Sequence, residues 1–491
     1  MPESNEPTVQ QYFDEFIQRE LEAAPITCGF AGPQKGKAIY AARALKPGEL
    51  IWSERPFVAM QHEDNKDFAD CCEHCFVSLI NSKDSWDRIE AANDGENDSA
   101  KFEDFEAAID LLQKQGGLSE EESYFNVYRL AKNKVQCTCG VLYCSEACKK
   151  AAYDEQHAIM CTRSDTNATP MGHFILHTQA TNEIFQLAAK VIARILSRFI
   201  ATHDMALARQ PVDMFCKLPW WDVVANEDDL EDGQTMEEYQ DCFKNLLSQT
   251  LEHFLNGLRD NLEHLAKNDE LRGLSVDAVM GTCAEVLSLE FFGCIVGMFE
   301  MNNISLEVDH PFHTLSEALS DAAADKSREL PASLTKVQTA LQKFALKHQH
   351  SCCDHDHEHG DEHAHDHAHD HEHDHHHHHH HHHEHANPEI EGAADEIDEC
   401  CGDAEQDFVG VEGTALFTGI CTMNHSCDPN CTVIYMKDGK AQVYAVQEIN
   451  PGEELCISYI DVDQDLEERQ SCLREYQFEC HCARCEEERN A

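Results

Sequence analysis

Basic residues are scarce in this sequence. Its 491 residues include 37 Lys and Arg against 92 Asp and Glu, which gives a formal net charge of −55. A surface this negative repels nucleic acid and anionic membranes and attracts cationic partners such as basic protein segments. We therefore expect no direct binding of nucleic acid, although a purely solubilising role of the acidic residues explains the charge equally well.

Long hydrophobic runs and a secretory leader are also missing. The most apolar stretch, residues 291–299, is too short to span a bilayer, and residues 1–20 are polar and acidic. We expect a monomer in the cytoplasm and nucleus without membrane association. There, the 25 cysteines are expected to form metal sites or free thiols rather than disulfides.

Metal-ligand residues recur in pairs between residues 72 and 161. The pairs are Cys72-x2-Cys75, Cys137-x-Cys139, Cys144-x3-Cys148 and His157-x3-Cys161. Zn²⁺ favours four ligands of this soft nitrogen and sulfur type in a tetrahedron. Seven cysteines and one histidine therefore suffice for two zinc sites.

Three further motifs follow one another near the C-terminus. Residues 424–430 read NHSCDPN, residues 452–459 read GEELCISY, and residues 480–485 read CHCARC. A strand-rich stretch, residues 432–446, separates the first two motifs. Near the N-terminus, GKAIYA at 36–41 and KPGELI at 46–51 predict a strand, a turn and a second strand.

In their order and spacing, these motifs resemble the SET-and-MYND protein-lysine methyltransferases, in which a MYND zinc finger splits a SET domain. The resemblance implies an α+β fold, with SET-domain β-sheets split by the finger and by a helical insert. A cysteine-rich post-SET zinc segment and a disordered His-rich loop complete the expected fold. Since nothing follows residue 491, the resemblance is to the subgroup without a C-terminal helical-repeat domain.

The expected organisation has six parts. Residues 22–70 form the N-terminal part of the SET domain, 71–161 the MYND-type finger with an acidic insertion, 171–305 the helical insert, 306–410 a low-complexity acidic and His-rich insertion, 411–462 the catalytic C-terminal part, and 463–491 the post-SET segment. Apolar residues at spacings of three and four over 184–199 and 247–258 indicate core helices in the insert. Alternating His and acidic residues over 350–385 cannot build an apolar core.

The resemblance implies S-adenosylmethionine as the methyl donor and assigns roles around it. Tyr459 would be the catalytic residue, and the cofactor-binding residues would be Gly36, Lys37, Asn302, Asn424, His425 and Phe478. Asn303 is an alternative to Asn302, and Phe478 would either cover the adenine or wall the lysine channel. Ala38 stands where the family has a second glycine, so its methyl group could weaken cofactor binding.

The resemblance also distributes the metal ligands among three zinc ions. The first ion would take Cys72, Cys75, Cys144 and Cys148, the second Cys137, Cys139, His157 and Cys161, and the third Cys427, Cys480, Cys482 and Cys485. The third pair of the finger is C-x-C where the family usually has C-x2-C, which makes Cys137 a departure from the pattern.

The predicted function is S-adenosylmethionine-dependent protein-lysine N-methylation of basic substrates, either histone or ribosomal protein lysines. One alternative is an adaptor whose MYND finger binds proline-containing peptides beside an inactive SET domain. Ala38 favours the adaptor, whereas intact Asn424, His425, Cys427 and Tyr459 favour the enzyme. Another alternative is a metal buffer built on the His-rich tract, which is also compatible with a loop expansion that binds metal only incidentally.

Overall fold

The computed structural model describes residues 6–490 with gaps. The residues not described within that range are 33–34, 80–82, 84–85, 88, 91–99, 108–133, 165, 214, 216, 227–229, 231–232, 303, 311–315, 317–318, 321–331, 352–408, 437 and 477. The His-rich tract and most of the acidic insertion after Cys75 therefore lie outside the described residues. So does Asn303, the alternative to Asn302.

Twelve strands are defined among the described residues. They are β1 (Ile26–Gly32), β2 (Gly36–Ala41), β3 (Leu50–Glu54), β4 (Val58–Gln61), β5 (Val135–Gln136), β6 (Leu142–Tyr143), β7 (Ile304–Val308), β8 (Val411–Leu416), β9 (Asn424–His425), β10 (Cys431–Tyr435), β11 (Ala441–Ala445) and β12 (Glu454–Ile457). The sheet orders are β1-β2-β12-β9, β10-β11-β3, β4-β8-β7 and β5-β6. Strands from the two ends of the chain thus share sheets, because β2 pairs with β12, β3 with β11, and β4 with β8.

Helices connect and cover these sheets. The α-helices are α1 (Glu6–Arg19), α4 (Glu146–Ala152), α5 (Ala158–Met160), α6 (Pro170–Gln179), α7 (Ile184–Thr202), α8 (Met205–Asp213), α9 (Trp220–Val223), α10 (Met236–Lys267), α11 (Val276–Thr282), α12 (Leu289–Asn302), α14 (Ala332–Ser351), α15 (Leu466–Glu475) and α16 (Ala483–Asn490). Shorter helical turns are η1 (Asn65–Asp67), η3 (Tyr153–His157), η4 (Thr166–Ala168) and η6 (Ile420–Thr422). None of the helices in the described part of the chain is long and apolar enough to cross a membrane.

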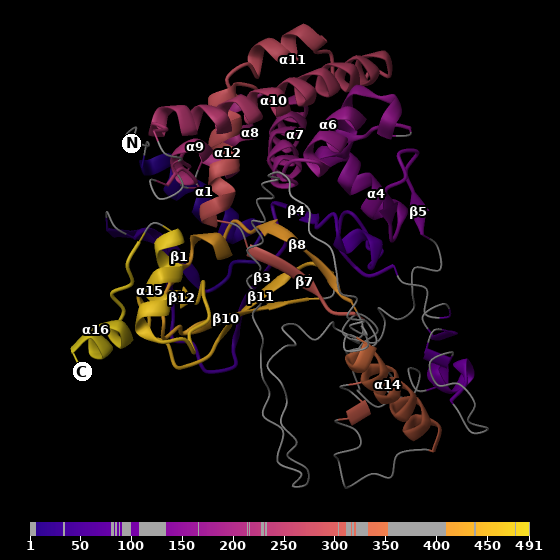
Figure 1. Cartoon of the computed structure of the whole chain (residues 1–491). Coiled ribbons are helices and arrows are strands. Elements are labelled where there is room, and N and C mark those ends of the chain that lie inside the picture. The colour runs from indigo at the N-terminus through magenta and orange to yellow at the C-terminus, as the bar shows by residue number, and fades with distance from the viewer. Residues whose placement is uncertain are drawn as a thin grey trace, which may run out of the picture.

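The helical region surrounds a core built on α7. The apolar residues of α7 recur at three and four, and they are buried against neighbouring helices and β4. Helix α10 begins at a capping box, in which the side chains of Thr235 and Glu238 each accept a backbone hydrogen bond. Figure 1 shows α6 to α12 gathered on one side of the strands.

Two glycines let α12 lie close to the segment before and within α9. A Cβ at Gly297 would lie 2.2 Å from the backbone oxygen of Leu218, and one at Gly293 would lie 2.5 Å from the Trp221 ring. Any larger residue would push the elements apart. These contacts fix the direction of α12, which ends at Asn302 beside β7.

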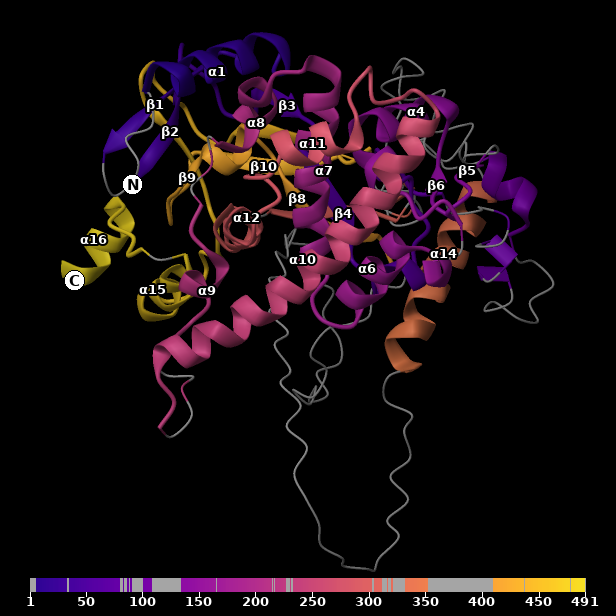
Figure 2. The same cartoon turned by 90° about the horizontal axis from the view of Figure 1, so that it is seen from above.

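Basic residues of α7 hold the cysteine-rich segment 71–161 against the rest of the protein. The ammonium of Lys190, only 8% exposed, donates to Glu73 Oε1 at 2.5 Å and to the Ala59 carbonyl at 3.1 Å. One turn on, Arg194 lies 3.4 Å from Glu155 Oε2. In both views α4, β5 and β6 of this segment lie on the opposite side of the molecule from α15 and α16 (Figures 1 and 2).

Candidate active site

The first and last parts of the chain meet at the candidate cofactor site. β9 runs parallel to β12, with Asn424 beside Cys456 and His425 beside Ile457. On its other edge β12 pairs with β2, which carries Gly36 and Lys37. The structure therefore brings four of the predicted cofactor-binding residues into one sheet, although nearly 400 residues separate the two strands that carry them.

Asn424 fastens these strands to each other. Its side-chain amide donates to the backbone oxygen of Lys37 at 3.0 Å and to Glu454 Oε1 at 2.8 Å. Gly36 begins β2 with a φ of +69°, a backbone conformation that residues with a Cβ rarely adopt. The bond to Lys37 thus fixes the backbone of the predicted glycine strand next to the NHSC segment.

Ala38, the departure from the family motif, is completely buried. It pairs with Gly29 of β1, and protein atoms cover its methyl group. The methyl group is therefore not exposed on the protein surface, and its effect on cofactor binding stays a prediction.

The His425 ring is engaged on both sides. Its Nδ1 accepts the backbone N–H of Tyr459 at 3.1 Å, so the ring hydrogen resides on Nε2, which lies 3.2 Å from Cys427 Sγ. Burial, together with the positive charge of Arg469, lowers the pKa of His425 to about 4. The neutral imidazole therefore positions protein groups, and only the backbone of His425 is left for the cofactor contact predicted from the sequence.

Tyr459 holds a half-buried, protonated phenol. Its hydroxyl donates to the Met423 carbonyl at 2.5 Å, and burial raises the pKa of this phenol far above its usual value. The ring centroid lies 5.5 Å from that of His425 and 6.3 Å from that of Phe478, edge to face. Phe478 also lies 6.1 Å from His425, so the predicted catalytic residue and two predicted cofactor-binding residues share one cluster.

Tyr476 belongs to the same cluster but was not predicted from the sequence. Its ring lies 5.3 Å from that of Tyr459, and its hydroxyl donates to the Tyr459 carbonyl at 3.5 Å. It stands two residues before Phe478, at the end of α15. An aromatic pair directly before the last cysteine motif was the signal that could have identified it.

Asn302 is the last residue of α12. Its side-chain amide donates to the Met298 carbonyl at 2.8 Å, within its own helix. Met298 lies one helical turn before Asn302, so this bond turns the Asn302 amide back toward its own helix.

Buried Glu54 anchors the turn that leads into β9. Its Oε1 accepts the N–H of Gly419 at 2.7 Å, and its Oε2 accepts that of Ile420 at 3.2 Å. The Trp52 indole donates to Oε2 at 3.2 Å as well. Burial raises the pKa of Glu54 to about 7, while these donors oppose the rise.

Twelve cysteine and histidine side chains form three clusters, each with its ligand atoms within 4.8 Å of one another. Cluster one is Cys72, Cys75, Cys144 and Cys148; cluster two is Cys137, Cys139, His157 and Cys161; cluster three is Cys427, Cys480, Cys482 and Cys485. These are the three ligand sets predicted from the sequence, and Cys137 lies within cluster two despite its irregular spacing.

Distances within the clusters suit metal ligands better than disulfides. Sγ–Sγ separations are 3.7 Å for Cys75 and Cys144, and 3.5 Å for Cys427 and Cys485. A disulfide needs about 2.05 Å. Tetrahedral geometry with metal–sulfur bonds of about 2.3 Å gives roughly 3.8 Å between sulfurs. Each cluster could therefore hold one metal ion.

Comparison with known proteins agrees with this geometry. The family model for the SET domain matches residues 221–460. Just under half of the chain thus resembles a SET domain. The match includes Tyr459 and the NHSC segment, and β2 to β4, outside it, pair with strands inside it.

Individual relatives extend the comparison beyond this segment. The chain is 25% identical to histone-lysine N-methyltransferase ATXR2 of Arabidopsis thaliana over 98% of this chain and 94% of that protein. Identity reaches 50% with human N-lysine methyltransferase SMYD2, over 15% of this chain and 17% of the relative. With human histone-lysine N-methyltransferase SMYD3 it is 44%, over 17% and 19%. The predicted resemblance to SET-and-MYND methyltransferases is confirmed.

Proposed function

We propose that this SET domain protein is an S-adenosylmethionine-dependent protein-lysine N-methyltransferase. The observation that carries the proposal is the half-buried Tyr459 phenol, held at the Met423 carbonyl beside a sheet that joins the Gly36 strand to Asn424 and His425. The names of the relatives, all lysine methyltransferases, support the same reaction. The adaptor alternative is not favoured, because Ala38 is the only motif change that supports it, whereas these relatives are all named as methyltransferases.

Methyl transfer requires a lysine amine without its extra proton, since an ammonium has no lone pair. Lysine normally has a pKa near 10.4, and an aromatic, water-poor channel lowers it. Tyr459, Tyr476 and Phe478 supply such walls. The cofactor would supply a methyl group activated on sulfonium sulfur.

Tyr459 would orient the amine. Because burial keeps its phenol protonated and the hydrogen is directed at the Met423 carbonyl, the phenol oxygen and that carbonyl can both accept N–H bonds from an incoming amine. An amine held this way directs its lone pair toward the methyl group. Positioning of this kind, rather than a strong general base, accounts for the proposed catalysis.

The cofactor residues fit an adenosyl ligand through backbone and ring groups. The backbone of Gly36, Lys37 and His425 would bind its polar end, and Phe478 would cover its adenine. Asn424 would hold the two strands together, and Asn302 would approach from α12. The three clusters would each bind Zn²⁺, with clusters one and two forming a MYND-type finger and cluster three a post-SET site.

Basic proteins are the proposed substrates, in the cytoplasm or nucleus. Directly after Tyr459, residues 461–468 read DVDQDLEE, and Asp461, Asp463 and Glu467 are exposed. Negative charge at the exit of a lysine site favours substrates with basic residues around the target. Histone and ribosomal protein lysines both meet this description, and proline-containing partners of the finger remain a separate proposal from the sequence.

Methyl-labelled S-adenosylmethionine offers the test. The purified protein is incubated with core histones and, separately, with ribosomal proteins, and the labelled residue is located by mass spectrometry. Label on lysine in either pool supports the proposal and names the substrate class. Cofactor binding with label on another residue type, or no cofactor binding by zinc-loaded protein, would refute it.

A further inference from the structure

A Zn²⁺ ion held by four thiolates of cluster three would place a net negative charge in the protein interior. Cys427, Cys480 and Cys485 are buried, and Cys482 is half-buried. Four thiolates around one Zn²⁺ leave a net charge of −2. Buried charge is strongly unfavourable unless hydrogen bonds or an opposite charge offset it.

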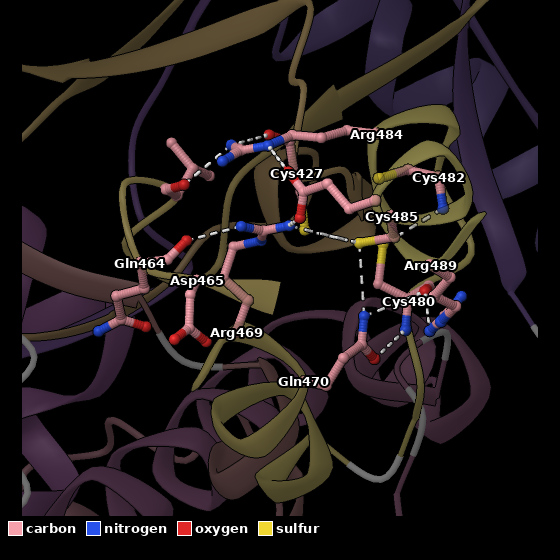
Figure 3. Close-up of polar contacts among 12 residues, drawn as sticks. Cys427, Gln464, Asp465, Arg469, Gln470, Cys480, Cys482, Arg484, Cys485 and Arg489 are labelled. Carbon is pink, nitrogen blue, oxygen red and sulfur yellow. Dashed lines mark hydrogen bonds and ion pairs between the residues drawn. The ribbon is translucent and has the colours of Figure 1, made fainter. Parts of the chain in front are cut away.

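Arg469 of α15 is the cation that faces this cluster. Its side chain is 1% exposed, and its Nη2 lies 4.0 Å from Cys485 Sγ (Figure 3). Nη1 donates to the Gln464 carbonyl at 2.6 Å. The buried Nε–H has no hydrogen-bond partner among the described residues, so the guanidinium is not fully occupied by protein acceptors.

Glu488 is the carboxylate that Arg469 contacts, but it does not neutralise the arginine fully. Arg469 Nη2 lies 2.5 Å from Glu488 Oε2, and Arg484 Nε lies 2.8 Å from Glu488 Oε1. Two positive charges therefore share one carboxylate, whose side chain is 35% exposed to water. One positive charge is left for the cluster, in a protein whose formal net charge is −55.

Neutral N–H groups complete the surroundings of the sulfurs. Gln470 Nε2 lies 3.4 Å from Cys485 Sγ, and Gln470 Oε1 accepts the Cys480 N–H at 3.0 Å (Figure 3). On the other side, His425 Nε2 faces Cys427 Sγ. Donors directed at ligand sulfurs stabilise the thiolate form that a metal requires.

We propose that Arg469 is the countercharge of cluster three and that its charge, rather than its bond to Glu488, keeps the metal ion bound there. The consequence for the NHSC segment rests on the proposed function. Cys427 is both a cluster ligand and the partner of His425. Retention of the ion by Arg469 would therefore also hold the segment that binds the methyl donor.

Zinc content and zinc release test this proposal without any activity measurement. Full-length zinc-loaded protein is compared with Arg469→Met, Arg469→Lys and Glu488→Gln by elemental analysis and by transfer of zinc to a colorimetric chelator. Cys427→Ser identifies the phase of release that belongs to cluster three. Arg489→Met is the matched control, because among the described residues Arg489 contacts the Cys480 carbonyl and the surface residues Glu486 and His481, and no cluster sulfur.

Three ions are expected in the unmodified protein. Arg469→Met should lose the cluster-three ion or release it at least about tenfold faster, as is typical when a group that contacts metal ligands is removed. Arg469→Lys should restore most of the retention, and Arg489→Met should behave as the unmodified protein. Glu488→Gln should release the ion no faster, because the whole arginine charge then faces the sulfurs.

Two results would overturn the proposal. One is unchanged release of the cluster-three ion from folded Arg469→Met. The other is a combined result: Glu488→Gln releases the ion faster than the unmodified protein, and Arg469→Lys releases it as fast as Arg469→Met. That result would show that the ion pair with Glu488 and its geometry retain the metal, and that the positive charge alone does not. If Arg469→Met fails to fold, Glu488→Gln and Arg469→Lys are compared with the unmodified protein: near-normal release from both supports the proposal, and accelerated release from both overturns it. Since zinc release requires no substrate, failure here is separate from failure of the methyltransferase proposal.

Discussion

The backbone N–H of Tyr459 donates to Nδ1 of His425 at 3.1 Å, and the opposite nitrogen of the same ring faces Cys427 Sγ at 3.2 Å. One neutral imidazole therefore connects the candidate catalytic tyrosine to cluster three. The parallel pairing of β9 with β12 brings these groups into reach, because it sets His425 beside Ile457, two residues before the tyrosine.

Replacement of His425 by Leu should affect Tyr459 and cluster three together. The change leaves the Tyr459 N–H without its acceptor, which costs about 1–3 kcal/mol in unfolding free energy. We expect a lower kcat and faster zinc loss from cluster three, measured by methyl transfer and chelator assays. His481→Gln, an exposed histidine beside Cys480, is the control and should change neither quantity. Normal zinc retention and kcat in His425→Leu would contradict this role.

Lys190→Met should loosen the cysteine-rich segment 71–161. The substitution leaves Glu73 without its 2.5 Å partner, and loss of a charged hydrogen bond of this kind costs about 1–3 kcal/mol. Denaturant unfolding measures the loss. A double-mutant cycle with Glu73→Gln isolates the pair, and a coupling energy near zero would show that other contacts hold the segment.

The raised pKa of the buried Glu54 carboxyl should make the stability of the folded protein depend on pH. This pKa is about 7 in the folded protein, above the reference value of 4.5. The folded state therefore binds the proton more tightly, so the stabilisation is complete below pH 4.5 and is lost as the pH rises to about 7. The full difference is roughly 3 kcal/mol.

Denaturant unfolding at several pH values, for the unmodified protein and for Glu54→Gln, measures this contribution. Subtracting the two curves cancels the pH dependence of the zinc ligands. The difference should fall between pH 4.5 and 7 and stay flat above it. A flat difference throughout would mean that the donors from Gly419, Ile420 and Trp52 keep Glu54 ionised at acid pH.

Gly297→Ala should displace α12. Its new Cβ would meet the Leu218 oxygen at 2.2 Å, and overpacking of this kind typically costs about 1–3 kcal/mol. Because α12 ends at Asn302, the dissociation constant for S-adenosylmethionine should also rise. Gly281→Ala in α11 is the matched control: nothing lies within 4 Å of its Cβ, so it should stabilise by about 0.5–1 kcal/mol. Equal unfolding midpoints for the two variants would contradict the packing argument.

Local patterns predicted the elements and ligand sets well. The spacing of three and four over 184–199 corresponds to α7, and GKAIYA and KPGELI correspond to β2 and the turn into β3. The ligand sets follow from short spacings joined by the family resemblance, and the structure brings each set together. The helical periodicity, the strand and turn motifs and the paired-ligand spacings each involve residues that are close together in the sequence, so each can be recognised without knowing the fold.

Contacts between distant residues could not be predicted. Glu54 and Gly419 are 365 positions apart, and nothing near Glu54 indicates a partner at η6. Likewise, the NHSC motif identifies His425 but not which atoms its ring engages, and a single Arg469 in an acidic segment has no local pattern. The burial of Ala38 could not be predicted either, because it depends on how β1 and the rest of the fold pack around β2.

Single-turnover methyl transfer by the unmodified protein and by Tyr459→Phe tests the central claim most directly. Both proteins must carry three zinc ions and bind S-adenosylmethionine with similar affinity. The account predicts methyl-lysine from the unmodified protein and a rate lower by on the order of 100-fold in Tyr459→Phe, since one positioned polar group is lost. Equal rates in the two proteins would contradict it.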